Sequence, residues 1–489
     1  MTHHTTNGSD NGKLAEPKNL THHFSDAANN IVPSPLKALY KYTGDPTKIS
    51  LASGLPPAEY FPFSSVQATV HDANKFSEDL AKVGEDFSFR VPLNSKDAGL
   101  DIPLELSLQY SASQGLPPLV DFLTEHTRMV HTPPYKNWDV VCTLGNTHAW
   151  DSVLTLFCNP GDTILVEKYC YPPPFVSANG KGYNVVPVFL DMDGIVPEKL
   201  ESLLANWQQS QGKFPRLLYT ICTGQNPTGS SLSEERRRAI YQICQKYDLL
   251  IIEDEPYYFL QMDPYEKEIE KRAHHSSPQS YEHFLNSLIP SFLKMDVDGR
   301  VLRMDSLSKV IAPGVRVGWI VGQKVFLEKV IRLNEYVIQA PNGFSQSLLY
   351  GLFSRWGQTG YLDWLINLRK EYTIRRDFAI DMIEKYLDRE YASWDAPVAG
   401  MFFHIEIDAS KHPKYEELGK DALAIEKLIF DRSLENGTVI VPGSWFQVDK
   451  SMASEKIFFR GTYAAVALKN LEKGMKQFSE ALRAEFSDN

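Results

Sequence analysis

The middle of the chain alternates short apolar runs with longer amphipathic stretches. Residues 147–157 and 234–247 carry apolar side chains at helical spacing, and Ser231 and Glu234 have the spacing of a capping box at the second of these predicted helices. Apolar runs bounded by turn residues predict short buried strands at 140–144, 163–167, 217–221 and 249–252. Repeated strand–helix–strand units predict an α/β fold around a mainly parallel sheet with helices on both faces.

Two later regions depart from this alternation. Residues 264–300 are charged and separate two strands that should be neighbours, so we expect a surface insertion with some helix. Apolar runs then resume at 301–304 and 319–321. From about residue 350 onward, long amphipathic helices mix with predicted strands, which is typical of a smaller α+β domain. These strands are expected at 400–407, 438–441 and 456–460.

The N-terminal region has no such periodicity. Residues 1–23 are polar and rich in His, Thr, Asn and Gly, so we expect a flexible tail. Prolines at several of the following positions indicate an extended arm. The expected division is therefore a tail (1–23), an arm with part of the small domain (24–95), a large domain (96–345) and a C-terminal small domain (346–489).

Composition excludes several classes of protein. Of the 489 residues 43% are hydrophobic and 23% charged, as in an ordinary globular protein, and a net charge of −11 argues against nucleic-acid binding. No apolar run approaches the roughly 20 residues of a membrane span, and the first residues contain no apolar signal core. The five cysteines show no metal-type pairing, which favours buried thiols in a reducing compartment. We expect a cytoplasmic enzyme without a metal ion, a nucleic-acid partner or a membrane partner.

The segment Ser306-Leu307-Ser308-Lys309 carries the first candidate chemistry. It ends a predicted strand, and Arg316 follows seven residues later. A partly desolvated lysine is nucleophilic and suits Schiff-base chemistry, while the hydroxyls and the guanidinium suit a bound phosphate. The alternative is that Lys309 is a solvated surface lysine.

Three other positions have polar residues at strand ends. Asp254 follows a buried strand, where a carboxylate could keep a pyridine nitrogen protonated, although a turn acid is equally compatible with the position. Asn226 lies in a turn and could donate to a phenolate oxygen. Asn146 and Thr147 follow Gly145 at a predicted helix start, which favours an anion but also fits simple N-capping.

The order and spacing of these segments resemble fold-type-I aminotransferases that depend on pyridoxal 5'-phosphate. The resemblance is carried by YTICTGQNPTGSSLSEERRRAIYQICQKYDLLIIEDEPYYFLQ (219–261) and RMDSLSKVIAPGVRVG (303–318). Kynurenine/2-aminoadipate aminotransferases are similar, and the fungal aromatic/2-aminoadipate aminotransferases are more similar still. The latter likeness rests on VPSPLK, LASGLPPAEYFPF, QYSASQG, PVAGMFF, VPGSWF and FFRGTYAAV, and it runs from about residue 24 to the C-terminus.

The resemblance implies a role for each matching residue around the cofactor. Lys309 would hold pyridoxal phosphate as an imine and move the substrate proton, and Asp254 would pair with the pyridine nitrogen. Asn226 and Tyr257 would contact the ring hydroxyl, and Tyr171 would stack on the ring. The phosphate would be bound by Asn146, Thr147, Ser306, Ser308 and Arg316, with Tyr110 reaching in from a partner subunit. Asn146-Thr147 departs from the Ser-Gln pair expected in the kynurenine branch.

The resemblance also implies the substrate contacts and the reaction. Arg460 would clamp the α-carboxylate, with Asn226 beside it, and Gly54, Leu55 and Tyr60 would belong to a segment that closes over the substrate. We expect a homodimer that moves the amino group of phenylalanine, tyrosine or tryptophan, and also of 2-aminoadipate, to a 2-oxo acid such as 2-oxoglutarate. The alternatives are a kynurenine/2-aminoadipate-preferring aminotransferase and other pyridoxal-phosphate chemistry. A pyridoxal-phosphate-binding transcription regulator is disfavoured because the segment before Ser34 is too short and too polar for a DNA-binding domain.

Overall fold

The structure is a computed structural model that describes residues 14–35, 47, 51, 54–73, 86–272, 280–451 and 454–487. The first part of the predicted tail, residues 1–13, lies outside these ranges. In the described part of the chain, none of the helices combines the length and apolar composition needed to cross a lipid bilayer.

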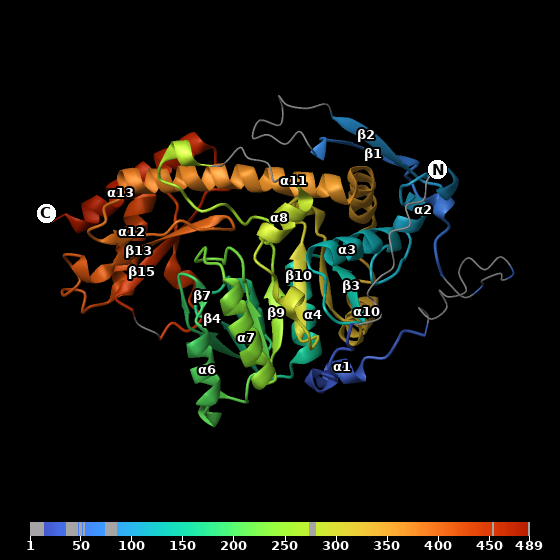
Figure 1. Cartoon of the computed structure of the whole chain (residues 1–489), viewed down its shortest axis with the longest axis horizontal. Coiled ribbons are helices and arrows are strands. Elements are labelled where there is room, and N and C mark those ends of the chain that lie inside the picture. The colour runs from blue at the N-terminus through green and yellow to red at the C-terminus, as the bar shows by residue number, and fades with distance from the viewer. Residues whose placement is uncertain are drawn as a thin grey trace.

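A seven-stranded sheet forms the centre of the large domain (Figure 1). All neighbouring pairs are parallel except those of β11, which runs antiparallel to both β10 and β3. The sequence prediction of a mainly parallel sheet is therefore confirmed. In spatial order the strands are β3 (Trp138–Thr143), β11 (Gly318–Gln323), β10 (Val301–Ser306), β9 (Leu250–Asp254), β8 (Leu217–Thr220), β4 (Thr163–Glu167) and β5 (Asn184–Val188).

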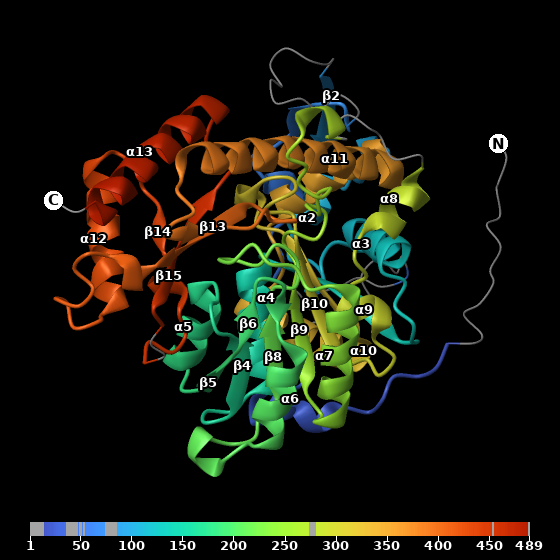
Figure 2. The same ribbon diagram turned by 60° about the vertical axis from the view of Figure 1, so that its left-hand side comes forward.

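Helices cover this sheet in two groups. One group contains α4 (Asn146–Phe157), which packs against α5 (Pro172–Gly180) and α10 (Lys324–Val337). The other contains α7 (Glu234–Lys246), which packs against α6 (Pro197–Ala205) and α9 (Phe292–Met295). Helices α6 and α7 lie in front of the strands in Figure 2. The smaller elements of this domain are α3 (Pro117–Val130), β6 (Leu190–Asp191), β7 (Gly194–Ile195), η6 (Gln209–Gln211) and η8 (Pro313–Val315).

The start of α7 differs from the prediction in its capping residue. Ser233, not Ser231, is the N-cap, and its side chain accepts a hydrogen bond from the Arg236 N–H. The Ser231 hydroxyl instead accepts from the N–H of Gly224 at 2.9 Å. The predicted capping box is wrong because Ser231 stabilises the preceding turn.

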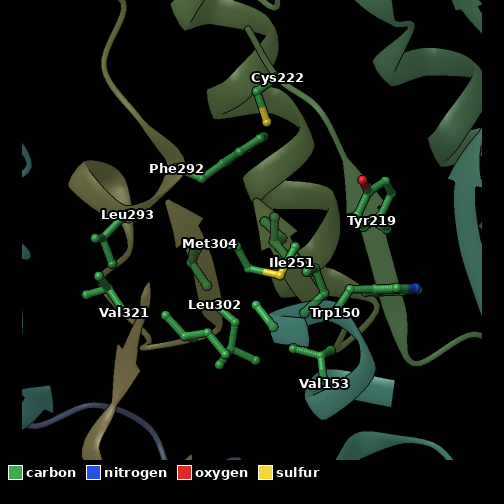
Figure 3. Close-up of a cluster of buried hydrophobic side chains, with 14 of the residues drawn as sticks. Trp150, Val153, Tyr219, Cys222, Ile251, Phe292, Leu293, Leu302, Met304 and Val321 are labelled. Carbon is green, nitrogen blue, oxygen red and sulfur yellow. The ribbon is translucent and has the colours of Figure 1, made fainter. Parts of the chain in front are cut away.

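The core of the large domain includes part of the predicted surface insertion. Phe292 and Leu293, both 0% exposed, pack among residues of the sheet and α4 (Figure 3). The prediction of a surface insertion is therefore wrong for the second half of 264–300. The sequence of this half looks polar because its short apolar stretches are separated by acidic residues such as Asp296, which are themselves buried. The segment contains η7 (Ile269–Lys271), α8 (Tyr281–Ser287) and α9 (Phe292–Met295).

A second apolar core lies in the C-terminal region. There a four-stranded antiparallel sheet packs against two helices, as predicted for an α+β domain. The strands, in spatial order, are β12 (Ala392–Ser393), β13 (Phe402–Asp408), β15 (Lys456–Thr462) and β14 (Val441–Pro442). The helices are α12 (Ala422–Glu435) and α13 (Leu468–Phe486), with η9 (Ala409–Lys411) and η10 (Gly443–Phe446) between strands.

The long helix α11 (Gly343–Tyr386) joins the two cores. Leu349 in its first half belongs to the large core, and Ile383 near its end belongs to the second core. Gly357 interrupts the helix with a φ of 63°, a left-handed conformation that glycine adopts without steric cost. The predicted domain boundary between residues 345 and 346 falls in the first turn of this helix.

The N-terminal region packs on the large domain. Leu20 is only 3% exposed, and the imidazole of His22 lies 2.6 Å from Asp248, so the prediction of a flexible tail is wrong for residues 14–23. Apolar contacts with the large core outweigh the polar composition there. The elements that follow are η1 (Thr21–His23), α1 (Asp26–Asn30), η3 (Ala58–Tyr60), β1 (Ser65–Val70), β2 (Phe87–Pro92), η5 (Ser95–Asp97) and α2 (Leu104–Ser107).

Candidate active site

The carboxyl ends of β8, β9 and β10 open into a cavity of about 370 Å³. A second cavity of about 430 Å³ lies in the small domain beside Glu426 and Phe458, but it contains none of the predicted site residues. The cavity at the sheet is therefore the candidate active site, as expected for a ligand site in a parallel sheet. Its walls include Asn146, Thr147, Tyr171, Asn226, Asp254, Tyr257, Ser306, Ser308, Lys309, Arg316 and Arg460.

Lys309 lies in the turn that follows β10. Its neighbours Leu307 and Val310 are buried in the large core, which anchors the turn and leaves the lysine side chain on the cavity wall. Partial burial lowers the pKa of the Lys309 amine from its usual value. Such an amine is a stronger nucleophile near neutral pH than an exposed lysine.

Asp254 ends β9 and faces the same cavity, with 8% of its surface exposed. One carboxylate oxygen, Oδ1, accepts from the side-chain amide of Asn146 at 2.6 Å. The other, Oδ2, accepts from the hydroxyl of Tyr219 at 2.5 Å. Burial raises the pKa of Asp254 to about 6, while both hydrogen bonds favour the ionised form.

The side chain of Asn146 takes a different position from the one predicted. Its amide donates to Asp254 and to the carbonyl of Met304 at 3.0 Å, so both N–H bonds point away from a phosphate at the helix start. The backbone N–H groups of Asn146 and Thr147 can still face an anion, because the first residues of a helix have no carbonyl one turn earlier to donate to. The prediction that Asn146 contributes to an anion site thus rests on its backbone.

One end of the cavity is built for an anion. Gly145, the N-cap of α4, has a φ of 95°, and a Cβ there would lie 2.8 Å from the Nη2 of Arg316. Glycine thus lets the guanidinium approach the helix N-terminus, where Arg316 donates to the carbonyl of Leu144 at 2.6 Å. The hydroxyls of Ser306 and Ser308 lie 2.9 Å apart on the same wall. A helix N-terminus, a guanidinium and two hydroxyls form a suitable phosphate site.

Arg460 on β15 brings a second guanidinium to the cavity from the small domain. Its Nη1 donates to the side-chain oxygen of Asn226 at 2.7 Å, and its carbon atom Cζ lies 4.4 Å from the ring centre of Phe402 and 4.7 Å from that of Phe446. Its Nε is buried and has no hydrogen-bond partner among the described residues. A buried donor of this kind fits an incoming carboxylate.

Two tyrosines line the cavity near these charges. Tyr171 is the N-cap of α5 and is 40% exposed. Tyr257 is buried, its ring lies edge-on to Phe402 at 6.0 Å, and burial raises its pKa well above the usual value. It therefore remains a hydrogen-bond donor at neutral pH.

Four predicted site residues do not line the cavity of a single chain: Tyr110, Gly54, Leu55 and Tyr60. The two segments that carry them meet where the side chain of Gln109 donates to the carbonyl of Pro56 at 2.9 Å. Tyr110 and Tyr60 are 57% and 78% exposed. The structure therefore separates the predicted site into a cavity group and a surface group.

Sequence reasoning missed several residues that line the cavity, and also Tyr219, which lies behind the wall and bonds to Asp254. Tyr219 was assigned only to a strand and Trp150 only to a helix. The hydroxyl of Tyr219 in an apolar strand, beside a strand that ends in Asp254, could have indicated a contact between the two side chains. Phe402 belongs to the small domain, and its place at the cavity depends on packing between distant segments. Trp150 and Phe402 line the cavity together with Ile221, Pro173, Pro174, Pro256 and Pro313.

Comparison with known proteins decides the family. The model of the family described as aminotransferase class I and II matches residues 106–478. The chain belongs to this family. The match spans the whole cavity wall from Asn146 to Arg460. The predicted resemblance to fold-type-I aminotransferases is thereby confirmed, and the protein is an aminotransferase.

Individual relatives support the same conclusion. An aromatic amino acid aminotransferase of Schizosaccharomyces pombe is 42% identical over 476 residues, covering 96% of this chain and 99% of the relative. The crystal structure of the aminotransferase Aro8 from Candida albicans superposes with a TM-score of 0.92 at 48% identity, covering 96% of this chain and 99% of that one. The mitochondrial kynurenine/alpha-aminoadipate aminotransferase of Rattus norvegicus is 33% identical, covering 92% and 96%.

Aminotransferases of this family depend on pyridoxal 5'-phosphate, and the cavity fits that cofactor. A Cβ at Gly145 would fill the space where Arg316 meets the helix N-terminus, so the anion end exists only because glycine is there. On the same cavity wall, Asp254 offers a buried carboxylate for a ring nitrogen. Lys309 supplies the amine, and the anion end supplies the phosphate contacts.

Proposed function

We propose that this aminotransferase moves the amino group of phenylalanine, tyrosine or tryptophan to a 2-oxo acid such as 2-oxoglutarate, and that it also accepts 2-aminoadipate. One observation carries the proposal: the guanidinium of Arg460 lies within 4.7 Å of the ring centres of both Phe402 and Phe446, its buried Nε has no partner among the described residues, and it shares the cavity wall with Lys309. This geometry binds an α-carboxylate beside aromatic surfaces. The fission-yeast relative is named an aromatic amino acid aminotransferase, which supports the aromatic part of this proposal.

Each cavity residue then has a defined task. Arg460 binds the substrate carboxylate and orients the Cα–H bond, and Asn226 keeps the guanidinium in place. The Lys309 amine would take the proton from the substrate Cα and deliver it to the C4′ carbon of the bound cofactor. Asp254 would remain ionised and pair with the ring nitrogen of the cofactor, Tyr257 and Asn226 would contact the ring hydroxyl, and Tyr171 would stack on the ring. Bound pyridoxal phosphate supplies an electron-withdrawing ring that stabilises negative charge at Cα.

At the anion end we infer that the phosphate is bound by the first turn of α4, including Asn146 and Thr147, and by the hydroxyls of Ser306 and Ser308. Arg316 adds the positive charge. The arrangement combines a helix dipole with hydroxyl and guanidinium donors.

We also propose a homodimer in which Tyr110 completes the phosphate site of the neighbouring subunit, and in which Gly54, Leu55 and Tyr60 close over the substrate. The proposal is supported by the exposure of Tyr110 and Tyr60. Apolar side chains on the same part of the chain are also exposed, with Leu106 at 54% and Phe63 at 42%. A symmetric dimer would bury such a surface.

A cytoplasmic location is part of the same proposal. The five cysteines are all free and buried, which suits a reducing compartment.

A substrate panel tests the proposed specificity. The purified enzyme with its cofactor is mixed with phenylalanine, tyrosine, tryptophan, 2-aminoadipate or kynurenine in single turnover, and loss of the cofactor absorbance is followed. We expect conversion with all three aromatic amino acids and with 2-aminoadipate, followed by recovery on adding 2-oxoglutarate. No conversion with any aromatic amino acid would refute the proposal. Conversion with kynurenine and 2-aminoadipate alone would favour the alternative suggested by the rat relative.

A further inference from the structure

The two oxygens of Asp254 are each held by one donor from outside its own strand. The Tyr219 hydroxyl on β8 lies 2.5 Å from Oδ2, and the Asn146 amide on α4 lies 2.6 Å from Oδ1. Tyr219 has no task in the function proposed above, and the Asn146 side chain has none at the phosphate.

Neither donor can turn away easily. Tyr219 is 0% exposed, and its ring packs against Trp150 at 4.8 Å. The Asn146 amide also donates to the carbonyl of Met304. Turning that amide over would bring its oxygen against the Met304 carbonyl and the Asp254 carboxylate, so the N–H side must face Asp254.

Burial works against the charge that Asp254 needs. It raises the pKa of this carboxyl to about 6, and the hydrogen bonds from Tyr219 and Asn146 are the strongest of the opposing effects. Burial also raises the pKa of Tyr219 far above its usual value, so the phenol remains a donor. A neutral carboxylic acid would not keep a pyridine nitrogen protonated.

We propose that Tyr219 and Asn146 are positioning residues whose two hydrogen bonds keep the Asp254 carboxylate ionised and aimed at the ring nitrogen of the cofactor. The inference rests on the role proposed for Asp254. It gives the side chain of Asn146 a task different from binding phosphate.

Other ionisable groups face Asp254 and must be separated in any pH experiment. Burial raises the pKa of Glu167 to about 7, within the range where the reaction would be measured. A Glu167→Gln variant isolates that contribution. The groups in question are Glu167 on β4, Cys170 and Tyr257 on loops, and Arg303 and Asp305 on β10.

The test variants are Tyr219→Phe and Asn146→Ala, and the control is Tyr183→Phe. Tyr183 is also buried, but among the described residues its hydroxyl contacts only the Leu154 carbonyl, at 3.3 Å. The readouts are the dissociation constant of pyridoxal phosphate from the reconstituted enzyme and the pH profile of kcat/KM. We expect each test variant to bind cofactor about tenfold more weakly and to shift the acid limb upward by about 1 pH unit, because a donor to the ionised form is lost. Tyr183→Phe should change neither.

A double-mutant cycle with Asp254→Asn protects the test against general loss of folding. In that background no carboxylate remains to be ionised, so adding Tyr219→Phe should weaken cofactor binding by less than about twofold. An equally large loss in both backgrounds would overturn the inference, as would an unchanged acid limb in both single variants. If Asp254→Asn itself kept full activity and cofactor affinity, the proposed function of Asp254 would fail instead.

Discussion

At the scale of single residues, Glu167 shows how burial makes stability depend on pH. It is 1% exposed and accepts hydrogen bonds from the Thr220 hydroxyl and the Gln225 amide at 2.7 and 2.9 Å. Burial is the largest effect and raises its pKa from 4.5 to about 7. Because the unfolded chain ionises first, this carboxyl reduces stability increasingly as the pH rises from about 4.5 through about 7.

The effect of Glu167→Gln on the free energy of unfolding should therefore become more stabilising as the pH rises. We expect the melting temperature of the variant, relative to the unchanged protein, to be higher at about pH 8 than at about pH 5.5, since the amide cannot ionise. Thermal melting of cofactor-free protein at both pH values measures this difference. A difference that stayed constant or fell with pH would contradict the ionisation argument.

Arg460 permits a second prediction at this scale. Arg460→Lys should lower kcat/KM for tyrosine by about 100-fold, because a lysine cannot donate two parallel hydrogen bonds to a carboxylate. The affinity for pyridoxal phosphate should change by less than about threefold. Arg238→Lys, at an exposed position on α7, is the matched control and should change neither. Equal losses in substrate use and cofactor affinity would argue against a carboxylate clamp.

At the scale of elements, local patterns predicted most of the large sheet and its helices. The runs at 140–144 and 163–167 are strands β3 and β4 within a residue or two, because buried parallel strands have continuous apolar sequences. The meeting of the motif residues at one cavity could also be predicted, because the carboxyl ends of parallel strands lie at the same edge of the sheet. The helix cap at Ser233 did not follow, because Ser231 offers the same chemistry two residues earlier.

Long-range packing accounts for the other failures. Phe292 was assigned to a surface insertion, yet its backbone N–H donates to the buried Glu253 at 2.7 Å and its ring is enclosed. Leu20 was assigned to a tail, yet it joins the large core. The Asn146 amide turns toward Asp254 because of a neighbour 108 residues away. None of these contacts leaves a periodic signal in the sequence.

The place of Phe292 in the core leads to a stability prediction. Phe292→Ala should lower the free energy of unfolding by about 3 to 5 kcal/mol, because the removed ring leaves a cavity. Phe214→Ala, where the ring is 42% exposed, should cost much less. Denaturant unfolding of both variants compares them. Similar costs for the two would mean that residues 280–300 are not part of the core.

At the scale of the whole molecule, the proposed dimer divides each site between two chains. Mixing a Lys309→Ala protein with a Tyr110→Ala protein, followed by subunit exchange, should restore activity to about a quarter of the unchanged level, because half of the dimers are mixed and each has one intact site. Activity before and after exchange is the measurement.

The outcome depends on which chain supplies Tyr110. If Tyr110 served the cavity of its own chain, every site in the mixed dimer would carry a substitution, and no activity would return. Each variant alone, taken through the same subunit-exchange procedure, is the control and should remain inactive or weakly active.

The most direct test of the account concerns Lys309. The protein is supplied with pyridoxal phosphate, treated with borohydride, digested and mapped by mass spectrometry. We predict one adduct with the mass of the cofactor, on Lys309. The control is Lys168→Ala, because Lys168 is also partly buried and its pKa is also lowered by burial; this variant should keep the adduct on Lys309. Lys309→Ala should carry no adduct and show no turnover. An adduct only on a different lysine, or none on the unchanged protein, would contradict the account.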